Sequence, residues 1–129
     1  MNVLTQRFFA AARICSSELS IKQRLTDAWM LHLDEVSPAE LPRCHREKFV
    51  ALREVLYERK PLPAESAPEA SIRKMSKQQV ASCTDLIVTI FGELTQAQSD
   101  SHISGKDHDN HVGSGVVTNL KDRLSQQLN

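Results

Sequence analysis

Apolar residues recur at intervals of three and four from Val3 to Leu94, and this spacing limits what the chain can fold into more than any other feature. It places apolar side chains on one face of a helix. The first stripe predicts a helix over residues 3–15, with the members Val3, Leu4, Phe8, Ala11, Ala12 and Cys15. A strand is the alternative for the run Leu86–Phe91, which is rich in β-branched residues. We expect a helix there too, because the flanking spacing is helical and no second strand is available for pairing.

Serines mark the expected helix starts. Four of them stand three residues before a glutamine or glutamate, the pattern of a capping box: Ser20 with Gln23, Ser37 with Glu40, Ser66 with Glu69 and Ser76 with Gln79. They predict a helix from Ser20 to about Val36, a short corner at Ser37, a brief helix over residues 67–75 and a long helix after Ser76. The corner is short because Pro42 interrupts it.

A further helix is predicted from Arg43 to about Arg59, where His45, Phe49, Leu52 and Leu56 form an apolar stripe. The proline-rich stretch 60–69 that follows should be a connector. We therefore expect an all-α fold of about four main helices, packed either up-and-down or orthogonally. The predicted core contains Phe8, Trp29, Phe49, Leu52, Ile87 and Phe91.

The composition changes after Leu94 to glutamine, serine, aspartate, histidine and glycine. We expect a helical domain over residues 1–97 and a polar, flexible tail over residues 98–129. A thin apolar stripe near the end predicts a short amphipathic helix over residues 116–128, one that needs a partner to form. The stripe consists of Val117, Leu120, Leu124 and Leu128.

Charge and cysteine content indicate a soluble, cytoplasmic protein. Lysine plus arginine equals aspartate plus glutamate at 16 each, so the whole chain has no strong field for nucleic acid or an anionic membrane. Three cysteines, Cys15, Cys44 and Cys83, lie far apart and are odd in number, which favours reduced thiols over a disulfide framework. No apolar run approaches the ~18 residues that a membrane span requires.

Two clusters could bind a metal or carry chemistry. His32, Cys44 and His45 could meet across the bundle as a metal site or a reactive thiol, but their spacing matches no common zinc site. The tail residues Asp107, His108, Asp109 and His111, with His102 nearby, are suitable ligands for a transition metal, yet they do not form a calcium-binding loop. No phosphate loop or catalytic motif is present. We expect a hydrogen-bonded core-edge histidine and a solvated linker instead, with no cofactor.

A basic patch within residues 43–77 provides an alternative function. Its members are Arg43, Arg46, Lys48, Arg53, Arg73, Lys74 and Lys77, and all but Lys48 are our candidates for phosphate contacts. The patch could serve a nucleic-acid-binding regulator, but it lacks aromatic interleaving and zinc-finger spacing. A solvated helical face explains it as well.

By elimination, the sequence favours a non-catalytic protein–protein interaction or regulatory module over an enzyme. Two contact modes fit it: Val117, Leu120, Leu124 and Leu128 could enter a partner's groove, or the chain could self-associate through an exposed stripe of its first and last long helices. The nucleic-acid-binding regulator is the second hypothesis. A small metal-binding protein or enzyme is the third.

Overall fold

The computed structural model describes residues 2–103, and the side chains of residues 2–97. Within that range every regular element is a helix, so the all-α prediction is confirmed. The elements are α1 (Val3–Cys15), α2 (Ile21–Ala28), the π-helical segment η1 (Trp29–Leu33), the 3₁₀ turn η2 (Pro38–Glu40), α3 (Arg43–Leu56), α4 (Ala67–Arg73) and α5 (Lys77–Ile103).

All four serine signals lie where a helix begins. Ser37 and Ser66 form complete capping boxes with Glu40 and Glu69, at the starts of η2 and α4. At the start of α5, the Ser76 hydroxyl accepts a hydrogen bond of 3.1 Å from the Gln79 backbone N–H. The Ser76 backbone N–H in turn donates to the Gln79 side-chain oxygen at 2.7 Å. Ser20 accepts from the backbone amide of Gln23, but the Gln23 side chain turns to Asp27 instead. The local sequence therefore determines where these helices start.

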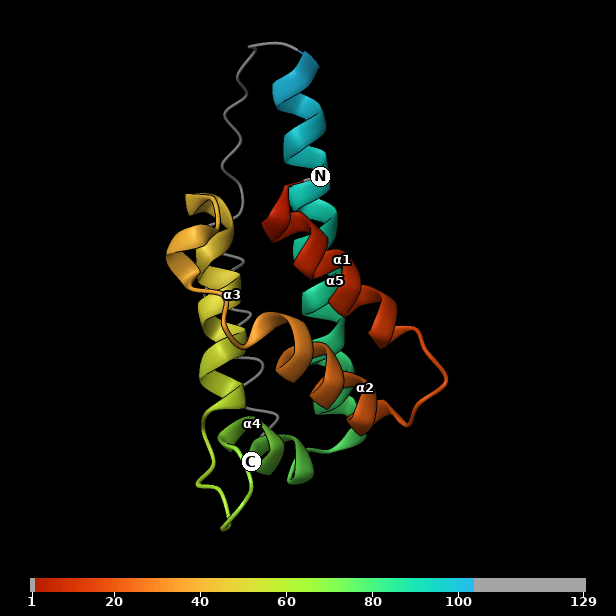
Figure 1. The fold of residues 1–129 in the computed structure, drawn as a ribbon, viewed down its shortest axis with the longest axis vertical. Coiled ribbons are helices and arrows are strands. Elements are labelled where there is room, and N and C mark those ends of the chain that lie inside the picture. Colours follow the sequence, from red (N-terminus) through yellow and green to blue (C-terminus); the bar gives the residue numbers. More distant parts are fainter. Residues whose placement is uncertain (1, 104–129) are drawn as a thin grey trace.

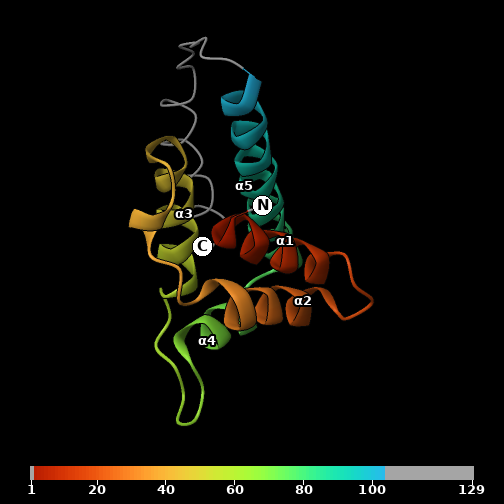
Figure 2. The same cartoon turned by 45° about the horizontal axis from the view of Figure 1, so that its top comes forward.

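The helices cross rather than run up and down. Helices α1 and α2 lie side by side and pass obliquely over α5, while α3 stands beside α5 and α4 lies below α2 and α3 (Figures 1 and 2). This arrangement corresponds to the orthogonal option. Helix α5 packs on α1, α2 and α3, so it is the central element.

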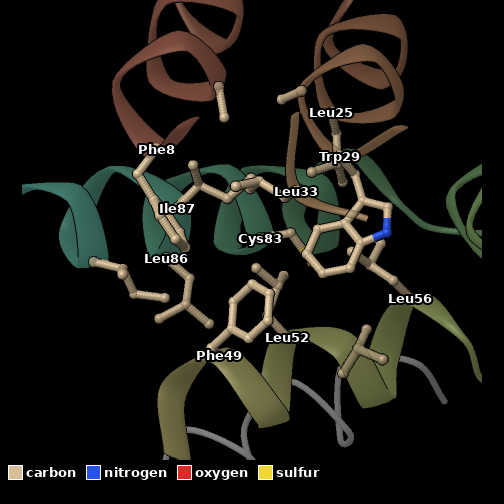
Figure 3. Close-up of a cluster of buried hydrophobic side chains, with 14 of the residues drawn as sticks. Phe8, Leu25, Trp29, Leu33, Phe49, Leu52, Leu56, Cys83, Leu86 and Ile87 are labelled. Atoms are coloured by element: carbon tan, nitrogen blue, oxygen red, sulfur yellow. The ribbon is translucent and has the colours of Figure 1, made fainter. Parts of the chain in front are cut away.

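The core lies where α1, η1 and α3 meet α5. Phe8 and Trp29 both pack on the Phe49 ring, with centroid separations of 5.8 and 5.5 Å. Figure 3 shows these side chains converging with Leu52 on the face of α5 that carries Cys83 and Ile87. Five of the six predicted core residues are fully buried. The sixth, Phe91, is half-buried and packs against the edge of this core.

Helix α5 carries its apolar residues over a broad face. Their spacing predicts a stripe of Val80, Thr84, Ile87, Phe91 and Leu94, widened by Cys83, Leu86, Val88 and Ile90. Thr84 and Phe91 are only half-buried. The buried apolar residues of α5 are Val80, Cys83, Leu86, Ile87, Ile90 and Leu94. Two apolar faces of comparable strength share this helix, and the partner helices cover only one of them. The other face is exposed through Val88, which is 46% accessible.

Three helices also differ from the prediction. The helix that begins after Ser20 becomes a π-helix at Trp29, where the Asp34 amide donates to the Trp29 carbonyl at 2.8 Å. Helix α3 ends at Leu56 instead of Arg59, because the chain turns toward α4 and the Arg59 amide donates to the Ser71 hydroxyl at 3.1 Å. Helix α5 continues to Ile103, past the composition change at Leu94.

No helix of the described residues combines the length and the apolar character that crossing a membrane requires.

Candidate interaction face

The outer side of the seam between α1 and α5 carries the exposed apolar side chains Phe9 and Val88. We call it the α1–α5 face and define it by Phe9, Ala12, Arg13, Ala81, Thr84, Asp85, Val88 and Phe91. A shallow hollow of about 310 Å³ lies within it. Small side chains such as Ala12, Ala81 and Thr84 line the hollow, and Val88 stands at its edge. The small side chains leave room for a side chain from another molecule.

An aromatic pair bounds the face at one end. The rings of Phe9 and Phe91 lie 5.6 Å apart, and the Arg13 guanidinium lies 5.7 Å from the Phe9 centroid. Phe9 is 39% accessible although it packs on Phe91. The pair therefore presents a supported aromatic surface to solvent, unlike a lone exposed side chain, which is ordinary on any protein.

Opposite charges lie on the two helices of this face. Arg13 is on α1, Asp85 is on α5, and both are exposed. Within the described part of the chain, ion pairs join Glu93 to His45 and Lys48, and Glu65 to Arg73, but none involves Arg13 or Asp85. Sequence reasoning missed both residues. A signal was available for Asp85, which is a charged residue directly before the apolar run Leu86–Val88.

Of the suspected His32, Cys44 and His45 cluster, only the last two meet. The Cys44 sulfur lies 3.4 Å from His45 Nε2. His45 is buried, and its Nδ1 lies 3.0 Å from Glu93 Oε1, within ion-pair distance but outside hydrogen-bond alignment. Lys48 pairs with the other oxygen of Glu93. Sequence reasoning missed Glu93, although a carboxylate between the apolar positions Ile90 and Leu94 was a signal of a buried partner.

The candidate metal ligands do not come together within the part of the chain that the structure describes. No three histidine, cysteine, aspartate or glutamate side chains there are close enough to hold an ion together, so His32 does not complete a ligand set with Cys44 and His45. The tail candidates Asp107, His108, Asp109 and His111 lie outside the described residues, as do Val117, Leu120, Leu124 and Leu128. The side chain of His102 lies outside them as well.

The basic patch is spread over three helices. Arg43 and Arg46 lie in the first turn of α3 and Arg53 lies nearer its end, whereas Arg73, Lys74 and Lys77 lie near the junction of α4 and α5. A helix of this length separates its ends by about 20 Å.

Three of the six candidate phosphate contacts are engaged within the chain. Arg46 donates to the Leu41 and Ala39 carbonyls, and Arg53 donates to the Asp34 and Val36 carbonyls. Arg73 donates through two nitrogens to the Glu65 carboxylate. That carboxylate's pKa is lowered, chiefly by the hydrogen bond from Arg73. Arg43, Lys74 and Lys77 are exposed.

A second hollow, of about 460 Å³, lies between the start of α1, η2 and the C-terminal half of α5. Its lining includes Asn2, Arg46 and Leu94. Asn2 accepts from the Thr5 amide as the cap of α1, and Arg46 is bonded as described above. These polar groups therefore already have structural roles.

No protein-family profile, curated protein or solved structure matches this chain.

Proposed function

We propose that this protein is a non-catalytic interaction module that forms a homodimer through the α1–α5 face. The observation that carries the proposal is the combination of exposed apolar side chains with opposite charges that lie on different helices of one face. In a monomer, the apolar side chains of Phe9 and Val88 would remain partly exposed to water, which is unfavourable.

A second copy is the occupant that the charges favour. In a two-fold dimer the same patch meets itself, so each residue of one copy contacts its complement on the other. Arg13 on α1 and Asp85 on α5 are such complements. Apposed faces bring Arg13 of one copy to Asp85 of the other, twice in each dimer. The same geometry brings Val88 of each copy toward the small residues of the opposite hollow.

We place this dimer in the cytoplasm. The described fold contains three free cysteines and no disulfide between them. Free thiols persist in a reducing compartment.

Sedimentation velocity of the full-length chain over a concentration series tests the proposal. We expect a reversible monomer–dimer equilibrium. Val88→Glu should weaken the dimer by at least about tenfold, because it inserts two charges into an apolar contact. Leu62→Glu is the matched control, since Leu62 is 57% accessible but lies in the proline-rich connector. It should leave the equilibrium unchanged.

Charge reversal identifies the contact more precisely. Arg13→Asp and Asp85→Arg should each weaken the dimer by about two- to tenfold, the range expected for exposed pairs. The double variant should recover most of the loss, because it restores two opposite pairs. Recovery would not occur if the two residues faced different molecules.

Two results would overturn the proposal. One is a wild-type chain that stays monomeric throughout the series. The other is a dimer that survives Val88→Glu but is lost in Leu124→Asp, which would locate the contact at Val117, Leu120, Leu124 and Leu128.

A further inference from the structure

The three cysteines of this chain lie in different environments. Cys83 is fully buried in the core, and burial raises the pKa of its thiol to about 12. Burial also raises the pKa of the Cys15 thiol to about 11, and Arg24 only partly offsets that effect. Cys44 is exposed to solvent. The thiolate is the nucleophile, so Cys83 and Cys15 react poorly at neutral pH. Cys44, in contrast, is accessible to a reagent.

A base lies beside the exposed thiol. His45 Nε2 is 3.4 Å from the Cys44 sulfur, and the other ring nitrogen is 3.0 Å from Glu93 Oε1. A ring that has taken up a proton is therefore stabilised by the Glu93 carboxylate. Because Lys48 holds the second oxygen of Glu93, the carboxylate is fixed in place between α3 and α5. A nucleophile, a base within reach and a third group behind the base form the arrangement that activates thiols elsewhere.

The position of Cys44 on its helix acts in the same direction. Cys44 is the second residue of α3, a helix whose N-cap, Pro42, offers no side-chain acceptor. No N-cap side chain therefore offsets the positive end of the helix dipole, which favours an anion nearby.

The charged groups near this site are few. His45 and Lys48 are on α3 and Glu93 is on α5, while Arg43 adjoins Cys44 in sequence and Glu47 lies one turn further along the helix. Glu40 of η2 is engaged with the Ser37 amide.

We infer that Cys44 is a reactive thiol that exchanges with low-molecular-weight disulfides, with His45 as the acceptor of its proton. The thiol proton passes to His45 Nε2, and the Cys44 sulfur attacks one sulfur of the incoming disulfide. The disulfide's S–S bond breaks as the new S–S bond forms. One half stays on Cys44 as a mixed disulfide, and the other half leaves as a thiolate. Glu93 is a positioning residue, because it acts only through the imidazole.

Treating the full-length protein with oxidised glutathione and mapping the adducts by mass spectrometry tests this inference. At about pH 7 the adduct should form first on Cys44, and His45→Gln should slow its formation by at least about tenfold. At about pH 10 the two rates should converge, because hydroxide in the solvent then removes the thiol proton without help from the imidazole. A merely structural effect of the substitution would persist at both pH values.

Glu93→Gln is a second test variant, needed in case the His45 variant does not fold. Its side-chain amide preserves the shape of the carboxylate. It should slow the reaction at about pH 7 and converge with wild type at about pH 10, whereas Glu58→Gln, at an exposed site, should change neither rate. Far-UV circular dichroism confirms that each variant folds. Equal rates for wild type and both test variants at neutral pH would overturn the inference, as would adducts that form as quickly on Cys15 or Cys83.

Discussion

The indole nitrogen of Trp29 donates a hydrogen bond of 3.0 Å to the carboxylate of Asp34, across the turn of π-helix that separates them. The same carboxylate oxygen accepts from the Tyr57 hydroxyl. Arg53 lies over both aromatic rings, 5.8 Å from the Trp29 centroid and 5.0 Å from the Tyr57 centroid. One aspartate thus joins the end of the second helix to the end of α3. Burial raises the pKa of the Tyr57 hydroxyl, and the contact with Asp34 raises it further.

Replacing Asp34 by alanine should destabilise the fold by about 2–3 kcal/mol, because the Trp29 N–H loses its acceptor in a largely buried position and Tyr57 loses its own. The midpoint and slope of urea unfolding measure the change. Asp27→Ala is the control, since Asp27 accepts only a surface hydrogen bond from Gln23. A cost for Asp34→Ala no greater than that of the control would show that the Trp29 contact contributes little.

Gly92→Ala should stabilise the protein by up to about 1 kcal/mol, because glycine is the poorest helix former after proline. Gly92 lies inside α5, and an added Cβ would meet no atom within 4 Å. The urea midpoint of the variant, compared with wild type, gives the result. A loss of stability would mean that this position needs glycine for a reason that the packing does not reveal.

Alkaline pH should destabilise the fold through Cys83. The folded-state pKa is raised to about 12 from an ordinary value of 9.0. The contribution of this raised pKa to stability is fully present when the pH is below the pKa of Cys83 in the unfolded chain. It is lost as the pH rises through the pKa of Cys83 in the folded protein. The window is therefore about pH 9 to 12, with a slope of up to about 1.4 kcal/mol for each pH unit.

Unfolding free energies measured at several pH values between about 8 and 10.5 isolate this effect. Cys83→Ala costs stability at every pH by leaving a cavity. Beyond that constant cost, the stability of the variant should fall less steeply than that of wild type. Parallel curves for the two proteins would contradict the assignment to Cys83.

Most of the fold could be predicted because its signals are local. Ser66 and Glu69 are three residues apart and define a helix start by themselves, and the bounds predicted for α1 are those observed. The faces of α5 could not be assigned in this way. Val88 and Ile87 are adjacent apolar residues, and which of them is buried depends on where α1 and α3 lie. That information is not local.

The candidate sites were harder to predict from the sequence for the same reason. Cys44 and His45 were singled out as neighbours, but Glu93 comes to them from a helix far along the chain. Arg13 and Asp85 are brought to one face only because α1 packs against α5. His32 was considered as a neighbour of His45 across the bundle, but the residue that lies beside His45 is Glu93. Pairwise contacts of this kind require the tertiary arrangement.

The π-helical turn at Trp29–Leu33 is also the place in the helices where the loss of one residue should be tolerated best. A π turn contains one residue more between bonded partners than an α turn does. Deleting one residue there would convert it to an ordinary α turn, so the segments on either side could keep their faces. A deletion within α3 would instead rotate every later side chain of that helix by about 100°, turning the apolar stripe away from α5. Insertions and deletions should thus be better tolerated at this turn than elsewhere in the helices, which a scan of single-residue deletions would reveal.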